Sequence, residues 1–209
     1  MAKPRSTTST RARRGPKPQN QRSDVRDAAL ALFAERGYRS TGVRDIADAL
    51  GIGPTSVYSH ISSKAELLRE IVLSTLDAVL EIQADVIASS TDVVDQVRRI
   101  AESQVRYFTQ YPQEAIVTTR DFQWADDQDL TEILERRQRY RRRLEDILRR
   151  GTAEGRLVAE NPKIASFAII EMCEAVPRWF RASEELSATQ IAYLYGEYAI
   201  RIAGGANRH

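Results

Sequence analysis

The sequence predicts an all-α protein of about nine helices, in which a small three-helix domain precedes a larger helical domain. Apolar residues recur at i, i+3, i+4 and i+7 along most of the 209 residues, and no stretch alternates as a half-buried strand does. Capping residues, glycines and prolines separate these helical stretches. The length is sufficient for one small and one medium domain.

The first two helices are short and end at glycines. The first is expected to begin at a Ser23-Asp24 cap and to end before Gly37. Its apolar stripe consists of Val25, Ala28, Ala29, Leu32 and Phe33. We expect Thr41 to cap a second helix that ends at Gly51.

The third helix is expected to open at Pro54 and to run to about His60, since a proline at the first helical position loses no hydrogen bond. Ser63 and Glu66 have the S-x-x-E spacing of a capping box and start a long fourth helix. The remaining helical segments are expected over residues 91–110, 112–124, 129–154, 161–181 and from 187 onward. Asn161-Pro162 is expected to cap the segment 161–181, and Ser187 and Gln190 to form a capping box at the start of the last helix.

Composition excludes several classes of protein. Cys173 is the single cysteine, so no intramolecular disulfide can form, and no Cys/His cluster is present to hold zinc. No apolar run approaches the roughly 18 residues of a membrane span, and the basic N-terminus has no apolar signal segment after it. These features predict a cytoplasmic protein with no membrane association, no metal and no cofactor.

The net charge of +2 conceals an asymmetry along the chain. Residues 1–22 carry seven Lys and Arg and no acid, and residues 1–70 carry 13 basic and 7 acidic residues, a charge of +6. Residues 71–209 carry 18 basic and 22 acidic residues, a charge of −4. We therefore expect the N-terminal third to meet a polyanion, with residues 1–22 as a disordered basic arm. A solubilising tail is the alternative for the arm.

Two short helices joined by Gly51-Ile52-Gly53 have the arrangement of a helix-turn-helix, whose second helix enters a DNA major groove about 12 Å wide. Such helix pairs also occur in ordinary helical proteins, so this spacing alone does not establish DNA binding. The residues themselves are more specific. The stretch from Gly37 to Leu68 closely resembles the N-terminal signature of the TetR family of transcriptional regulators, in its Val43-Arg44-Asp45-Ile46-Ala47, Val57-Tyr58-Ser59-His60 and Ser63-Lys64-Ala65-Glu66-Leu67-Leu68 segments. The resemblance covers residues 23–72.

The resemblance implies a DNA-binding domain over residues 23–70 and a ligand-binding and dimerisation domain over residues 71–209. The implied DNA contacts comprise phosphate ligands and base-reading residues of helices two and three, namely Thr41, Arg44, Pro54, Thr55, Ser56, Tyr58, Ser59, His60 and Lys64. Thr41 is expected to serve both as a helix cap and as a phosphate donor. Arg44 is the long cation best placed for a guanine.

The sequence departs from the family pattern at three points. Gly53 replaces the commoner serine cap, and Ile61 replaces an aromatic residue. The third helix contains no Arg, Lys, Asn or Gln, so readout there must depend on short hydroxyls, methyl contacts and DNA shape. The operator sequence is therefore not derivable.

The C-terminal domain is where the resemblance implies dimerisation and ligand binding. A four-helix bundle made by the last two helices of each subunit would use the apolar seam Ile191, Leu194, Tyr195, Tyr198 and Ile202, although such a seam also suits the subunit's own core. Candidate ligand residues are an aromatic group and a polar stripe, namely Tyr107, Phe108, Tyr111, Phe122, Trp124, Glu171, Glu174 and Arg178. The alternatives are core for the aromatics, and a solvated stripe with a Glu174–Arg178 pair for the rest.

The sequence thus predicts a homodimeric, ligand-responsive regulator, a repressor released from an inverted-repeat operator on double-stranded DNA by a small effector. An acyl-coenzyme A is one candidate effector, suggested by the arginines around Tyr140 and by Pro177-Arg178-Trp179-Phe180-Arg181. An enzyme has little support, because no nucleophile–His–acid set or phosphate-binding glycine loop is present. A helical scaffold without specific DNA binding is the second alternative.

Overall fold

The computed structural model describes residues 21–181 and 186–205, and within these ranges every regular element is a helix. The helices are α1 (Arg22–Arg36), α2 (Val43–Leu50), α3 (Pro54–Tyr58), α4 (Lys64–Ser89), α5 (Val93–Gln110), α6 (Pro112–Arg120), the short 3-10 helix η1 (Phe122–Trp124), α7 (Asp127–Ala153), α8 (Pro162–Trp179) and α9 (Ala188–Ile202). The predicted all-α fold is confirmed. The predicted basic arm lies outside the described residues apart from its last two, of which Arg22 opens α1.

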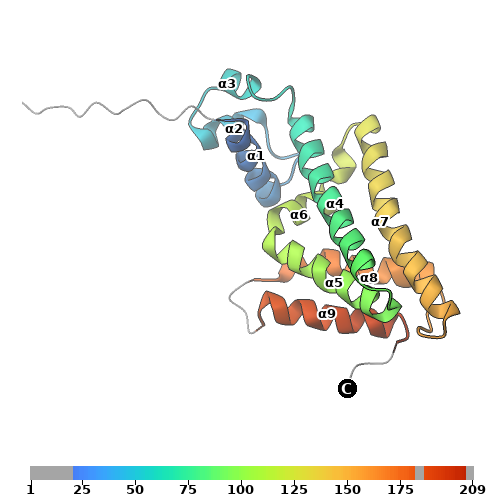
Figure 1. Cartoon of the computed structure of the whole chain (residues 1–209). Coiled ribbons are helices and arrows are strands. Elements are labelled where there is room, and N and C mark those ends of the chain that lie inside the picture. The colour runs from blue at the N-terminus through green and yellow to red at the C-terminus, as the bar shows by residue number, and fades with distance from the viewer. Residues whose placement is uncertain (1–20, 182–185, 206–209) are drawn as a thin grey trace, which may run out of the picture.

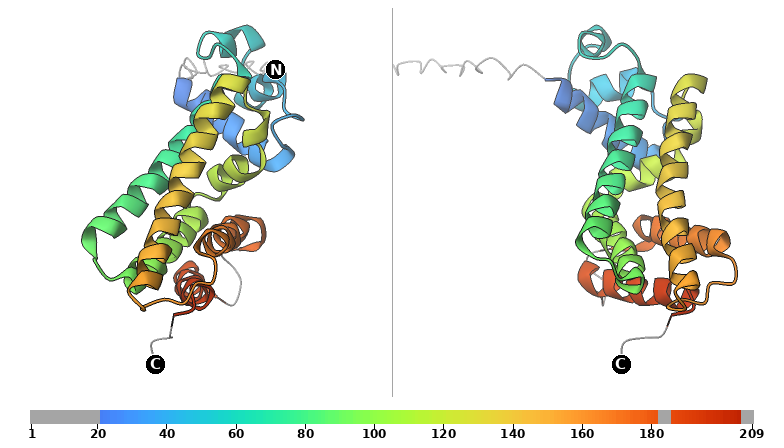
Figure 2. Two further views of the ribbon diagram at one scale, coloured as in Figure 1. Left: turned by 90° about the vertical axis from the view of Figure 1, so that its right-hand side faces the viewer. Right: turned by 45° about the vertical axis from the view of Figure 1, so that its right-hand side comes forward.

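The helices form an elongated molecule with α1, α2 and α3 at one end (Figure 1). The long helices α4 and α7 run side by side along its length, while α8 and α9 lie across the opposite end (Figure 2). Helix α9 packs mainly along α5, and α6 lies between α1 and α4. None of the helices described is both long and apolar enough to cross a membrane.

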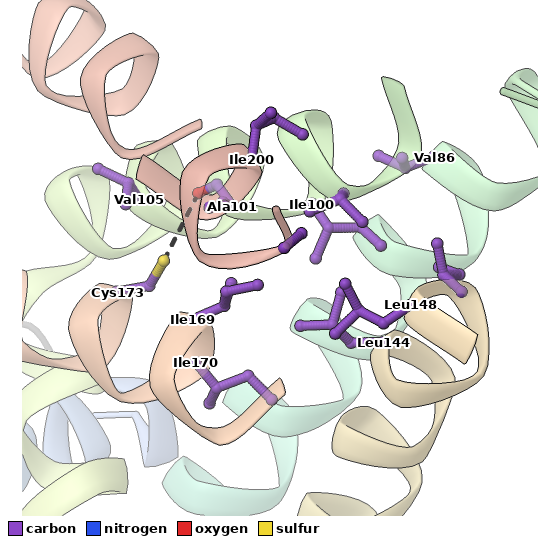
Figure 3. Close-up of a cluster of buried hydrophobic side chains, with 14 of the residues drawn as sticks. Val86, Ile100, Ala101, Val105, Leu144, Leu148, Ile169, Ile170, Cys173 and Ile200 are labelled. Atoms are coloured by element: carbon purple, nitrogen blue, oxygen red, sulfur yellow. Dashed lines mark hydrogen bonds between the residues drawn. The ribbon is translucent and has the colours of Figure 1, made fainter. Parts of the chain in front are cut away.

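Two hydrophobic cores explain this arrangement. The first unites α1–α3 with the first half of α4 and also takes in Val117 of α6 and Ile133 of α7. The second fills the space between the second half of α4 and α5, α7, α8 and α9, where Leu144, Ile169 and Cys173 are fully buried (Figure 3). Helix α4 therefore contributes to both cores and connects them.

Two of the predicted helix caps are observed as expected. Asn161 Oδ1 accepts a hydrogen bond from Ile164 N at 3.2 Å at the start of α8. Ser187 and Gln190 form a reciprocal capping box, with Gln190 N donating to Ser187 Oγ at 3.3 Å and Ser187 N to Gln190 Oε1 at 2.9 Å. Both helices thus begin where the sequence indicated.

Two other caps differ from the prediction. Helix α1 begins earlier, at a Gln21 N-cap, and the carboxylate of Asp24 accepts the backbone N–H of Gln21 at 2.7 Å. At α4, Ser63 caps the helix as predicted, but the carboxylate of Glu66 accepts from Ser62 N at 2.7 Å rather than from Ser63. At α1, Ser23 and Asp24 therefore lie within the helix, although their residue types are typical of N-caps.

Candidate nucleic-acid interface and ligand site

Helices α2 and α3 form a helix-turn-helix whose inner side packs against the first hydrophobic core. Gly51 ends α2 with φ +65°, a left-handed conformation that glycine adopts without a steric cost. Ile46 and Ala47 of α2 and Val57 of α3 are fully buried. Because these apolar residues face inward, the leading turn of α3 faces outward.

Most of the predicted DNA-contacting side chains are exposed on this outward face. Tyr58 is 55% exposed, and Arg44 makes no hydrogen bond or ion pair within the described part of the chain. His60 is half-buried. The exposed group consists of Arg44, Pro54, Thr55, Ser56, Tyr58 and Ser59. Ser59 Oγ donates to the carbonyl of Ser56 at 2.7 Å, so this hydroxyl already has a partner within the helix.

Thr41 does not have the environment that was expected. It is 1% exposed, and its hydroxyl donates to the carbonyls of Gly37 at 2.9 Å and Leu32 at 3.4 Å. The N-cap of α2 is Gly42, whose N–H is accepted by Asp45 Oδ2 at 2.6 Å. The prediction that Thr41 caps α2 and offers its hydroxyl to a phosphate is therefore wrong, because that hydroxyl ties the α1–α2 turn to the end of α1.

Lys64 has a structural role in addition to the predicted one. Its Nζ donates to the carbonyls of Tyr38 at 2.9 Å and Thr41 at 2.8 Å, and lies 4.1 Å from the centre of the Tyr38 ring. Partial burial lowers the pKa of its ammonium group. Two of its three donors are used inside the protein, which leaves one for a phosphate.

We expect Lys64→Ala to weaken DNA binding and to lower the slope of log affinity against log salt by about one, because one phosphate contact is lost. It should also loosen the α1–α2 turn, which Lys64→Arg would partly restore. Fluorescence anisotropy over a salt series measures the slope, and thermal unfolding measures the second effect. An unchanged salt slope together with a lower melting temperature would show that Lys64 is purely structural.

The contact between α6 and the end of α1 was not predicted. Arg120 Nη1 donates to the carbonyl of Ala34 at 3.2 Å, and Nη2 donates to that of Phe33 and to Asp121 Oδ2. Asp121 is buried and accepts the backbone N–H of Tyr38 at 3.3 Å. These partners are more than 80 residues apart in sequence, so no local pattern reveals them. The end of α6 is thereby fastened to the DNA-binding domain.

The five aromatic residues predicted to share a ligand pocket are dispersed. Tyr107 and Tyr111 pack on one another with ring centres 4.9 Å apart. Trp124 lies under the guanidinium of Arg39, 4.6 Å from its carbon. Phe108 lines one cavity, and Phe122 packs against Arg137, which lines another.

A pocket of about 100 Å³ lies where α7 and α8 meet below α4. It contains Glu171 and Glu174 from the predicted stripe together with arginines of α7, and its lining consists of Leu76, Arg137, Tyr140, Arg141, Phe167, Ile170, Glu171 and Glu174. Arg178 is exposed and does not line it. The predicted Glu174–Arg178 pair is not formed, because Glu174 Oε2 instead meets Arg137 Nη2 at 3.1 Å.

Aromatic rings support both pocket arginines. The guanidinium carbon of Arg137 lies 4.7 Å from the centre of the Phe122 ring, and that of Arg141 lies 4.5 Å from the Phe167 ring. Burial raises the pKa of Glu174, against the opposing effect of Arg137. This environment can receive an anionic group, since the arginine positions are held independently of any ligand.

The interior behind the pocket is polar. Tyr140 donates its hydroxyl to Gln104 Oε1 at 2.5 Å, and burial raises its pKa well above the usual value. Gln83 Nε2 donates to the carbonyl of Tyr140 at 3.0 Å. A row of polar side chains thus extends from the pocket toward α5 and α4.

A second, more apolar cavity of about 340 Å³ lies between the end of α5, the start of α6 and the end of α8. Phe108 from the predicted ligand set lines it, with Pro112, Ile116, Pro177 and Phe180. Helix α6 therefore contacts this cavity at one end and the DNA-binding domain at the other.

Residues of the predicted dimer seam do not share one environment. Ile191 is buried in the subunit's own core, and Tyr195 packs partly against that core. Tyr198 and Ile202 are exposed, while Leu194 is half-buried. Only part of the seam is thus available to a second subunit.

Comparisons with known proteins agree with this architecture. Residues 25–71 match the family described as bacterial regulatory proteins, tetR family, and residues 90–203 match the tetracyclin repressor-like C-terminal domain. The HTH-type transcriptional repressor KstR2 of Mycobacterium tuberculosis (strain ATCC 25618 / H37Rv) is 27% identical over 178 residues, which cover 84% of this chain and 89% of KstR2.

Solved structures give the same result. The ketosteroid transcriptional regulator KstR2 of Mycobacterium tuberculosis aligns with a TM-score of 0.81 and 25% identity, over 88% of this chain and 95% of that one. AibR, solved in complex with isovaleryl coenzyme A and operator DNA, aligns with a TM-score of 0.78 and 21% identity, over 87% of this chain and 98% of that one. With its C-terminal family match spanning more than half of its length, the chain belongs to the TetR family and is a ligand-responsive, DNA-binding transcriptional regulator rather than an enzyme.

Proposed function

We propose that the protein is a homodimeric repressor that binds an inverted-repeat operator and leaves it when an anionic effector enters the pocket between α7 and α8. The observation that carries this proposal is the pocket itself, in which two ring-supported arginines line a cavity in the C-terminal domain. KstR2 is named as a transcriptional repressor, which supports repression as opposed to activation.

On DNA, each subunit would place the leading turn of α3 in one of two successive major grooves about 34 Å apart. Arg44 would reach a base edge from α2, and the other contacts would come from Pro54, Thr55, Ser56, Tyr58, Ser59, His60 and Lys64. Thr41 no longer belongs to this set, since its hydroxyl is engaged.

An exposed apolar surface on α8 and α9 supports the homodimer. Ile164 is 60% exposed, and Trp179, Tyr198 and Ile202 are also exposed. Apolar and aromatic side chains at this density are typical of the centre of a protein–protein interface. Two copies of this surface would form the four-helix contact.

We expect Ile164→Asp combined with Ile202→Asp to yield monomers and to weaken operator binding, because a monomer can occupy only one half-site. Analytical ultracentrifugation gives the mass, and a gel shift gives the affinity. Leu134→Asp on α7 is the control, since Leu134 is exposed but lies away from α8 and α9. A double variant that remains dimeric would contradict this interface.

For the effector, an acyl-coenzyme A fits the pocket's charge. The AibR structure contains isovaleryl coenzyme A, and acyl-coenzyme A thioesters carry phosphates that arginines bind. A coupling of about 1–3 kcal/mol between effector and operator would change affinity roughly 5- to 150-fold.

A gel shift with DNA from upstream of the protein's own coding region tests the function. The ligand-free protein should shift a fragment that contains an inverted repeat and should not shift a scrambled one. An acyl-coenzyme A that binds should release the fragment. If no fragment is shifted specifically, repression at this operator is contradicted.

A further inference from the structure

Two arginines that line the pocket between α7 and α8 have buried hydrogen-bond donors without an acceptor. Arg137 Nη1 and Arg141 Nε have no partner among the described residues. Gln104 Nε2 on α5, behind the pocket, is a third such donor. Buried donors without acceptors are costly, so such a cluster indicates that an acceptor-rich group is bound in another state of the protein.

Glu174 supplies the carboxylate that partly meets this need. It is 8% exposed and contacts Arg137 from the facing helix. Glu171, one turn earlier on α8, lines the same pocket but is exposed and forms no salt bridge in the described structure. The carboxylate of Glu174 therefore has the position that a ligand's anionic group would require.

We propose that Glu174 is a built-in competitor of the effector, which occupies Arg137 until a carboxylate or phosphate group of the ligand displaces it. This inference rests on the proposed function, because it assumes that the pocket between α7 and α8 receives the effector.

Arg137 and Glu174 differ in the other contacts that are available to them. Arg137 packs on the Phe122 ring, so its guanidinium has a second contact besides Glu174. Glu174 has an alternative partner in Arg178, which is four residues later on the same helix and forms no salt bridge in the described residues. The carboxylate can therefore turn from Arg137 toward Arg178 and open the site without moving the backbone.

Displacement of Glu174 from Arg137 would also affect the DNA-binding domain. Phe122 belongs to η1 and packs against the first core. Asp121, its neighbour, accepts the backbone N–H of Tyr38. A change at Arg137 thus acts on a segment that is in contact with the α1–α2 turn.

Isothermal titration calorimetry with isovalerate and with pyrophosphate, at constant ionic strength, tests the proposal. Glu174→Gln removes the competing charge and retains the side chain's shape, so it should bind at least one of the two anions about tenfold more tightly than the wild-type chain. Glu81→Gln on α4, an exposed glutamate outside the pocket lining, is the matched control and should leave the affinity unchanged. Arg137→Gln should abolish binding in either background.

The two anions show whether the ligand's anionic group is a carboxylate or a phosphate. Tighter binding of isovalerate alone assigns a carboxylate, and tighter binding of pyrophosphate alone assigns a phosphate. If Glu174→Gln binds neither anion more tightly than the wild-type chain does, or if Glu81→Gln has the same effect, the proposal is overturned.

A measurement on the wild-type chain keeps the test valid if Glu174→Gln does not fold. The charged and titratable groups that act on Glu174 are Arg137, Glu171 and Arg178, with Cys173 and Tyr140 beside it. Exchanging Arg137 for the exposed Arg178 weakens the positive charge that lowers the pKa of Glu174, so anion binding should tighten as the pH falls. An affinity of the wild-type chain that does not depend on pH would overturn the proposal.

The result is separable from that of the proposed function. Gel shifts with each variant report operator binding in the absence of ligand, separately from anion affinity. If the variants shift no DNA but Glu174→Gln still gains anion affinity, the function fails and this inference stands.

Discussion

Replacing Glu197 with leucine should lower the free energy of unfolding by about 3–5 kcal/mol, the range for a buried ion pair that loses one partner. Arg98 on α5 and Glu197 on α9 are both buried, with Nε and Oε1 2.7 Å apart. Arg98 Nη1 and Nη2 have no hydrogen-bond partner in the described structure, so the variant removes the one carboxylate that is hydrogen-bonded to this buried charge. Urea unfolding at a fixed protein concentration measures the loss.

The double variant Arg98→Met/Glu197→Leu should recover most of that stability, because it removes both charges. Arg156→Ala breaks an exposed pair with Asp92 and serves as the control, with an expected change of about 0–1 kcal/mol. A Glu197→Leu chain as stable as this control would mean that water reaches Arg98.

Arg44→Ala should cost about 1–3 kcal/mol of operator affinity, or roughly 5- to 150-fold. Arg44 is exposed and is the only long basic side chain on α2 and α3. Since α3 supplies only short side chains and Tyr58, few other groups can make a bidentate contact with a base. Fluorescence anisotropy with operator and scrambled duplexes measures the effect.

The loss should be much larger on the operator than on the scrambled duplex. Arg142→Ala, which removes the same charge from the exposed face of α7, is the control and should change the affinity for neither duplex. Equal losses on both duplexes would make Arg44 a phosphate contact instead of a base-reading residue.

The sequence predicted what depends on local chemistry. The helical order followed from the apolar period, and the starts of α8 and α9 followed from caps whose partners are three residues away. The exposure of Arg44 and Tyr58 followed from the helix-turn-helix pattern. Each of these features depends on residues that are only a few helical turns apart in the sequence.

Contacts between distant segments were not predictable in this way. Glu174 pairs with Arg137, 37 residues away, although Arg178 has the favourable helical spacing. Thr41 was misassigned because its hydroxyl partners are the carbonyls of a turn whose path is set by tertiary packing. The aromatic residues were grouped by proximity in sequence, whereas the fold places Trp124 under Arg39 and Phe122 under Arg137, apart from Phe108 at its own cavity.

The positions of the two tryptophans give the protein a built-in optical readout. Trp124 lies under Arg39 at the junction between η1 and the DNA-binding domain, and Trp179 stacks near Tyr195 on the surface assigned to the dimer. Emission from Trp124 should therefore respond to movement of the DNA-binding domain, and emission from Trp179 to subunit association. Two variants with one tryptophan each, Trp124→Phe and Trp179→Phe, would allow both events to be followed separately in the unlabelled protein.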